Sequence, residues 1–173
     1  MLFRSALTTS EASALTTTQV KVLGADQIRA LSTASVAALT TDQVQALTTS
    51  QVASLTNNTV ASLTTDQVAA LSTAQVQVLA DSVVTGLSTT QLTALTTDQV
   101  TALTTSQVSI LTTGEVAALN TSQVAALTTD QVQALTVSQL TSLSNAQVSA
   151  LTTTQMGALT ATQLYGLVTA ANN

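Results

Sequence analysis

The side chains that could carry chemistry in this sequence of 173 residues are carboxylates, hydroxyls and amides, because it contains no His and no Cys. The commonest metal ligands, nucleophiles and general bases are therefore missing. The eight acids stand alone along the chain, at Glu11, Asp26, Asp42, Asp66, Asp81, Asp98, Glu115 and Asp130. We therefore expect no enzyme and no catalytic, cofactor-binding or metal-binding residue.

Two pairs of acids could still approach each other across stacked repeats, Asp66 with Asp81 and Asp98 with Glu115. The simpler interpretation is that they are solvated acids at the starts of helices, where a carboxylate favours the positive end of the helix dipole. The sequence also lacks a Gly-rich phosphate loop, a GxSxG motif and the alternating acids of a calcium loop.

Charge and hydropathy exclude two further classes of function. The only basic residues are Arg4, Lys21 and Arg29, and the net charge is −5, so a surface that tracks nucleic-acid phosphates is not expected. We interpret these basic residues as a solvated face, with a docking patch as the alternative. The mean hydropathy of +0.42 is high, but hydroxyls interrupt every apolar run well short of the about 20 residues that a membrane span needs. We expect no membrane insertion.

Leucine recurs at every eighth position from Leu7 to Leu167, without an insertion or a substitution. An apolar residue, usually Val, lies three positions before nearly every leucine, and a mostly small residue, usually Ala, lies directly before it. The consensus of this octad is T-T-x-Q-V-x-A-L. A repeat of this regularity predicts a repeat architecture.

The spacing and the capping residues favour one short helix in each octad. In a strand, Leu and Val would lie on opposite faces, and in one unbroken helix the leucine row would turn by about 80° per repeat. In the octad from Leu39 to Leu47, Thr40 as N-cap and Gln43 at N3 form a capping box, while Leu39 and Val44 form a hydrophobic staple.

We therefore predict an all-α fold, an α-solenoid (superhelix) of very short helices, one per eight-residue repeat. Leu, Val and Ala should line its core, and the variable positions, such as Asp42 and Gln45, should face outward. Helices of six or seven residues joined by about one residue are expected. Disorder is the alternative, because the residues are so few in kind.

The pattern also predicts boundaries and weak points. Residues 1–5 lie outside the repeat, and because Leu2 to Ser5 corresponds to codons shared with a common sequencing adapter, we interpret this start as an artefact. Residues 6–167 should form a single continuous octad-repeat solenoid, and residues 168–173 an irregular C-terminal end. Capping side chains are lost most completely at Ala80, where we expect fraying, and the amide alone is lost in Ser32–Ser35 and Thr56–Thr59.

The run LTTDQVQALTTSQV, from Leu39 to Val52, resembles the L-T-x-x-Q-V-x-A-L octads of large bacterial repeat proteins of the adhesin-like surface or secreted type. The likeness covers Leu7 to Leu167. It brings no catalytic or binding residues to transfer. What it implies is a spacer, stalk or scaffold segment with an extracellular or cell-surface location.

Our leading hypothesis for the function is a non-enzymatic structural segment of a larger protein, whose partners are neighbouring repeats. The alternative is a binding module that uses the outward positions, with Tyr165 as the one large aromatic side chain among them. Two further alternatives are an ice-binding array of threonines and a filament that forms through exposed solenoid ends by end-to-end self-association.

Overall fold

The computed structural model describes residues 7–171, and within that range its regular elements are helices alone. The start that we interpreted as artefactual, residues 1–5, lies outside the described residues. The chain divides into two compact units, Met1–Leu87 and Ser88–Asn173, and each is described by itself. The continuity of the array over residues 6–167 therefore stays a prediction.

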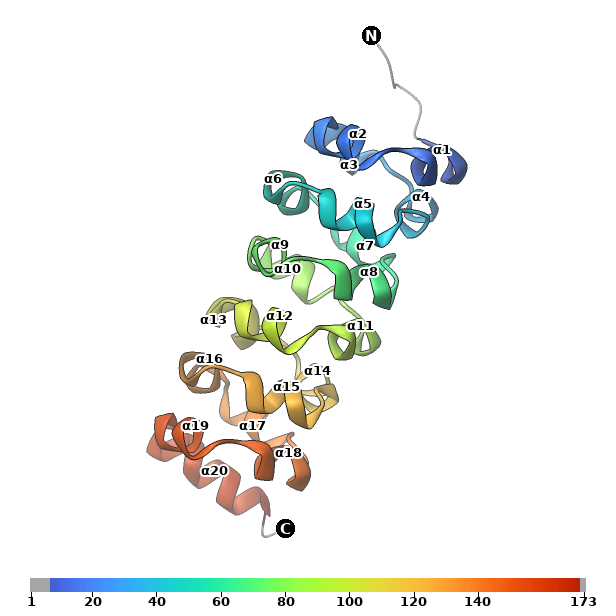
Figure 1. Ribbon diagram of the computed structural model, residues 1–173. Coiled ribbons are helices and arrows are strands. Elements are labelled where there is room, and N and C mark those ends of the chain that lie inside the picture. Colours follow the sequence, from blue (N-terminus) through green and yellow to red (C-terminus); the bar gives the residue numbers. More distant parts are fainter. Residues whose placement is uncertain (1–6, 172–173) are drawn as a thin grey trace. The chain divides into compact units, whose positions relative to one another are not determined.

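Each octad forms one helix, as predicted (Figure 1). The helices of the first unit are α1 (Thr9–Ala14), α2 (Thr17–Val22), α3 (Ala25–Arg29), α4 (Thr33–Ala37), α5 (Thr41–Ala46), α6 (Thr49–Ala53), α7 (Asn57–Ala61), α8 (Thr65–Ala70), α9 (Thr73–Gln77) and α10 (Asp81–Val84). The helices of the second unit are α11 (Thr89–Ala94), α12 (Thr97–Ala102), α13 (Thr105–Ser109), α14 (Thr113–Ala118), α15 (Thr121–Ala126), α16 (Thr129–Ala134), α17 (Val137–Thr141), α18 (Asn145–Ala150), α19 (Thr153–Ala158) and α20 (Ala161–Ala171).

Within each unit, every helix packs against the third helix along the chain, which makes three rows of stacked helices. The rows of the first unit are α1–α4–α7–α10, α2–α5–α8 and α3–α6–α9. Those of the second unit are α11–α14–α17–α20, α12–α15–α18 and α13–α16–α19. Each unit is therefore an α-solenoid in which three octads complete one turn. The octad pattern alone did not predict this number.

The capping box starts most of these helices, as the sequence predicts. In α5 the backbone N–H of Gln43 donates to Thr40 Oγ1 at 3.2 Å, and the N–H of Thr40 donates to Gln43 Oε1 at 2.7 Å. The same reciprocal pair is complete in fifteen of the helices α1–α19. Two orphan N–H groups are thereby satisfied at each start.

The departures from this box lie where the consensus residues are missing. In α4 and α7 the N-cap hydroxyl still accepts from the N3 backbone, but Ser35 and Thr59 lack the amide. In α10 the N-cap is Ala80, no side chain caps the helix, and the helix has only four residues. The uncapped start at Ala80 is therefore confirmed, and the fraying expected there stays a prediction.

The helices are shorter, and the junctions longer, than we predicted. Leu47 ends α5 with ψ of 137°, and Thr48 follows with ψ of 156°, so two extended residues separate α5 from α6. The N–H of Leu47 bonds to the carbonyl of Val44 three residues back, which tightens the last turn. The leucine and the threonine of each junction are therefore both extended and lie outside the helices, and the chain changes direction at these two residues.

Leucine and valine form the core, but the third buried residue is glutamine and not alanine. In the octad of α5, Val44, Leu47 and Gln43 are buried, whereas Ala46 is half-buried. Alanine is the last residue of the helix, where the neighbouring turn covers it only in part. The outward position of Asp42 and Gln45 is confirmed, because both are exposed.

The last helix differs from the rest and corrects the predicted end. Of residues 168–173, which we expected to be irregular, residues 168–171 continue α20, which has 11 residues. Val168 stands where other octads have an N-cap hydroxyl, so nothing there starts a new helix and the existing one continues. Gly166 allows the close packing of α20 on α17, since a Cβ atom there would lie 2.6 Å from Val137 Cγ1.

Candidate functional site

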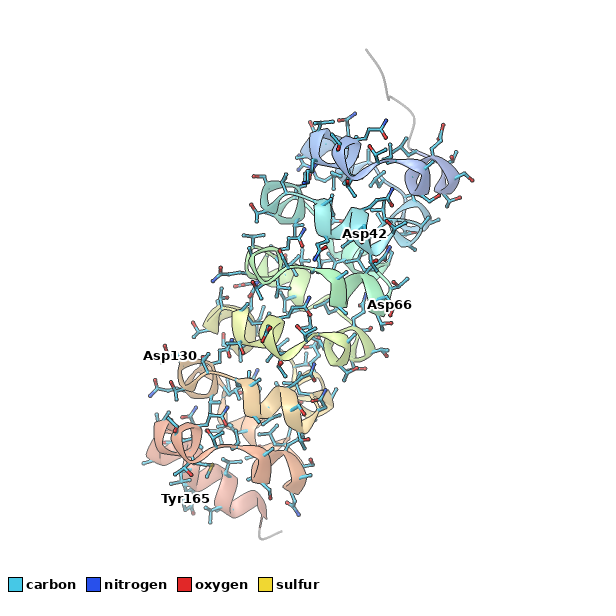
Figure 2. The ribbon with its side chains drawn as sticks, viewed as in Figure 1. Asp42, Asp66, Asp130 and Tyr165 are labelled. Atoms are coloured by element: carbon cyan, nitrogen blue, oxygen red, sulfur yellow. The ribbon has the colours of Figure 1, made fainter. Side chains whose placement is uncertain are left out.

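All six aspartates are exposed at the surface, and Asp42 and Asp66 lie in the same row of helices, α2–α5–α8. Asp42 and Asp66 are exposed on α5 and α8 of the first unit, and Asp130 is exposed on α16 of the second (Figure 2). Asp81 is on α10, outside the row of α8 that carries Asp66. Nowhere in residues 7–171 do three or more potential ligands of the types His, Cys, Asp and Glu gather to hold a metal ion.

The two glutamates, Glu11 and Glu115, occur at the N3 position of their helices, in place of glutamine. Glu11 accepts hydrogen bonds from the backbone and the hydroxyl of Thr8, which lower the pKa of its carboxyl below the ordinary value of 4.5. Glu115 is buried and accepts from the backbone N–H of Thr112 at 2.6 Å. Both acids therefore have structural roles as capping-box acceptors.

The other residues singled out from the sequence are dispersed. Arg29 forms an ion pair of 2.6 Å with Asp26 on the same helix, and Lys21 is exposed on α2, while Arg4 lies outside the described residues. Tyr165 is 73% exposed on α20, next to Leu164 and close to Val168, which are also exposed. None of the described helices combines the length and the apolar character needed to cross a membrane.

Among the residues whose burial is described, the N3 glutamines are the polar side chains that recur in the interior of both units. Gln43 is 2% exposed, and its Nε2 donates to the carbonyls of Ala12 at 2.9 Å and Leu15 at 2.5 Å. These acceptors lie at the end of α1, one turn of the solenoid earlier. Bonds to the leucine 28 residues earlier, of 2.5–2.8 Å, are made by Gln43, Gln51, Gln67, Gln75, Gln123, Gln131, Gln139, Gln147, Gln155 and Gln163.

Each of these carboxamides joins the start of its own helix to the end of an earlier one. Gln67, for example, accepts from the N–H of Thr64 at 2.8 Å and donates to the carbonyls of Val36 at 2.9 Å and Leu39 at 2.6 Å. The carboxamide oxygen accepts from an N–H group that has no acceptor within its own helix, and the two N–H groups of the carboxamide can serve two carbonyls at the end of the other helix. Glutamate could replace only the acceptor half. The capping box could be predicted from the sequence, but this longer bond could not, because it depends on the number of octads in a turn.

One row of the first unit lacks these bonds. The N3 residues of α1, α4, α7 and α10, which we call the gap row, are Glu11, Ser35, Thr59 and Val83. They are 24 residues apart, a spacing that is visible in the sequence once three octads are known to make a turn. Ser35 Oγ still donates to the carbonyl of Leu7 at 2.5 Å. Across the described residues, the carbonyls of Leu31 and Leu55 receive no donor.

The hydrogen bonds of the glutamines make the two sides of each turn different. The amide donors face the preceding turn, and the carbonyl acceptors face the following turn. The donor edge of the first unit consists of Gln19 and Gln27 with the half-buried leucines Leu15, Leu23 and Leu31. The acceptor edge of the second unit consists of the carbonyls of Leu143, Leu151 and Leu159 with the half-buried side chains of Val148 and Met156. Neither the amide nitrogens of the donor edge nor the carbonyls of the acceptor edge have a partner within residues 7–171.

Comparison with known families gives one match. The model of the ALTTAQ repeat matches residues 23–57, 84–113 and 109–137, which together make just over half of the chain. The chain belongs to the ALTTAQ repeat family. The ALTTAQ letters occur in the octads with one change, for example as ALTTSQ from Ala46 to Gln51.

The ALTTAQ lettering places the helix junction and the capping box within one motif. Its leucine is the C-cap of one helix, its first threonine is the N-cap of the next, and its glutamine is the buried N3 residue. No curated protein and no solved structure matches this ALTTAQ repeat chain.

Proposed function

We propose that this chain is a non-enzymatic structural segment, a spacer or scaffold whose length is set by the number of octads. The observation that carries the proposal is that the N3 glutamines join successive turns through backbone carbonyls. Because every octad offers the same carbonyls, turns can be added without any change in the bonds between them. The outward residues take no part in these bonds and are free to vary.

The outward surface supports a spacer over the alternative of a binding module. Exposed positions such as Asp42, Ser50 and Ala53 carry small or short polar side chains. Within residues 7–169, the large exposed apolar side chains are those of Val22 and of α20. A solenoid that binds a partner would concentrate large or charged side chains on adjacent repeats. The proposed bacterial origin and cell-surface location rest on the resemblance of the octads to bacterial repeat proteins.

The proposal can be tested by lengthening the chain. Variants that carry one or two extra copies of residues 112–135, three octads of the second unit, should remain helical by circular dichroism. Their maximum dimension in small-angle X-ray scattering should grow by about 8–10 Å per added turn, the distance between packed helices. Variants that stay helical without growing in length would contradict a spacer.

A further inference from the structure

The start of a helix inside the first unit can be held by two bonds between turns. Its N3 side chain donates to a leucine carbonyl of the preceding turn, and the leucine before its N-cap accepts from the following turn. At α6, Gln51 donates to the carbonyl of Leu23 at 2.7 Å, and the carbonyl of Leu47 accepts from Gln75 at 2.7 Å. The start of α5 is held in the same way.

The start of α7 has neither of these bonds. The hydroxyl of Thr59, at N3, shares a hydrogen bond of 2.7 Å with Thr56 Oγ1 of the same octad, and the carbonyl of Leu31 receives no donor from the described residues. The carbonyl of Leu55, directly before the N-cap, also receives none, because the residue 28 positions later is Val83. Since α7 packs on α4 and on α10, the residue types at positions 59 and 83 cause both losses.

In other respects α7 matches α6. Each helix has five residues and ends at a serine, Ser62 or Ser54, whose hydroxyl donates to the carbonyl of the N3 residue at 2.7 or 2.6 Å. Val60 and Val52 are both buried, and the backbone N–H of each donates to the N-cap carbonyl at 3.0 Å. The two helices differ at their starts, where α7 lacks the amide that serves both the capping box and the preceding turn.

The helices next to α7 in the chain are bonded to other parts of the first unit. The glutamines of α5 and α6 donate to the carbonyls of Leu15 and Leu23, and those of α8 and α9 donate to the carbonyls of Leu39 and Leu47. All four acceptors lie outside residues 56–63, the octad of α7. Separation of α7 from α4 would therefore leave these four bonds intact.

We propose that the octad of residues 56–63 is a release point of the first unit. It opens as a local unit and uncovers the face of α4 on which α7 packs, while α5, α6, α8 and α9 stay stacked. Segments with fewer bonds to their surroundings open at a lower free energy than the whole chain. A spacer whose octads were all equally stable would serve the proposed function as well, so the release point goes beyond that function.

The test is backbone amide hydrogen exchange of the full chain, measured by NMR and corrected for the intrinsic exchange rates of the sequence. The N–H groups of Val60 and Leu63 in the octad of α7 are compared with those of Val52 and Leu55 in the octad of α6. Their backbone hydrogen bonds are alike, at 3.0 and 3.1 Å against 3.0 and 3.0 Å. We expect exchange about 10-fold or more faster in α7, because its start lacks both bonds between turns.

The variant Thr59→Gln supplies an amide donor for the carbonyl of Leu31 and should slow exchange in α7 about 10-fold, with no change in α6. Two matched controls should leave the exchange of α7 fast. Thr59→Glu adds the acceptor of the capping box without a donor, as at Glu115, and Asn58→Gln places the amide at an exposed position.

The reciprocal variant, Gln51→Thr, gives α6 the N3 residue of α7. It should keep the fold, because Thr59 already occupies this position in α7, and circular dichroism checks this. Exchange of the N–H groups of Val52 and Leu55 should become about 10-fold faster. This variant tests the release point even if glutamine cannot be accommodated at position 59.

Three results would overturn the proposal. The first is equal exchange in α6 and α7 of the unaltered chain. The second is equal slowing by Thr59→Gln and Thr59→Glu, which would assign the effect to the capping box and not to the bond between turns. The third is unchanged exchange of α6 in the Gln51→Thr variant.

Discussion

At the scale of single residues, the amide of the N3 glutamine explains why this position is so often Gln in the octads. A buried polar side chain is tolerated only when its donors and acceptors are satisfied. Glutamine meets that condition because its oxygen serves the start of one helix and its nitrogen serves the end of another. Valine and leucine supply the apolar burial, and the amide fixes how one turn sits on the next.

Replacement of Gln67 by Glu separates these two roles. The variant keeps the acceptor for the N–H of Thr64 but removes the amide donor from the carbonyls of Val36 and Leu39 and sets a carboxylate against them. We expect a loss of about 3 kcal/mol in the free energy of unfolding, measured by chemical denaturation. The control Gln45→Glu, at an exposed position, should change it by less than about 0.5 kcal/mol. Equal effects of the two substitutions would contradict the role of the amide nitrogen.

The reverse experiment uses the gap row. Gln at position 59 in place of Thr59 would stand 31 and 28 residues after Ile28 and Leu31, the spacing at which the other glutamines find their acceptors. The carbonyl of Leu31 receives no donor from the described residues, and the amide of the variant would supply one. We expect Thr59→Gln to raise the free energy of unfolding by about 1 kcal/mol. Asn58→Gln, at the exposed neighbouring position, should leave the free energy of unfolding unchanged. A lower free energy of unfolding for Thr59→Gln would show that the gap row cannot accommodate the amide.

At the scale of the helix, the effect of a substitution on stability depends more on packing against the neighbouring helix of the same row than on helix propensity. Gly157 and Gly166 both lie inside helices, α19 and α20. A Cβ atom at Gly157 would meet nothing within 4 Å, whereas one at Gly166 would lie 2.6 Å from Val137 Cγ1.

The two glycines therefore predict opposite results for the same change. Gly157→Ala should stabilise the chain by about 0.5–1 kcal/mol, because alanine is the better helix former. Gly166→Ala should destabilise it by about 1–3 kcal/mol, because α20 must move away from α17. Thermal melts of both variants check the prediction. Stabilisation by both would mean that α20 can shift at no cost.

The local structure of each helix could be predicted from the sequence, because its causes lie within eight residues. Thr40, Gln43 and Val44 specify the cap, the box and the buried face of α5, and the structure confirms all three. The burial of Gln43 and the gap row could not be predicted, because they depend on contacts with the preceding turn. Nothing within one octad states that three octads complete that turn.

At the scale of the whole molecule, the hydrogen bonds that the glutamines make between turns repeat with every octad and not only with every turn of three octads. A glutamine finds its acceptors 28 and 31 residues earlier, and these positions are a leucine and an apolar residue in every octad of the regular pattern. Insertion of one octad rotates the later helices into the next row but presents each glutamine with equivalent carbonyls. Insertion of whole turns should therefore have no advantage over insertion of single octads.

This argument predicts the stability of chains lengthened within the second unit. Variants with one, two or three extra copies of the octad of residues 128–135 should each unfold at a denaturant concentration equal to or above that of the unaltered chain. The midpoint should not fall with each added octad, because each adds one buried Val, Leu and Gln together with its bonds to the preceding turn. If only the variant with three extra octads kept its stability, the array could be lengthened only by whole turns, which would contradict the prediction. Equal tolerance of all three variants would show that length is adjustable in steps of a single octad.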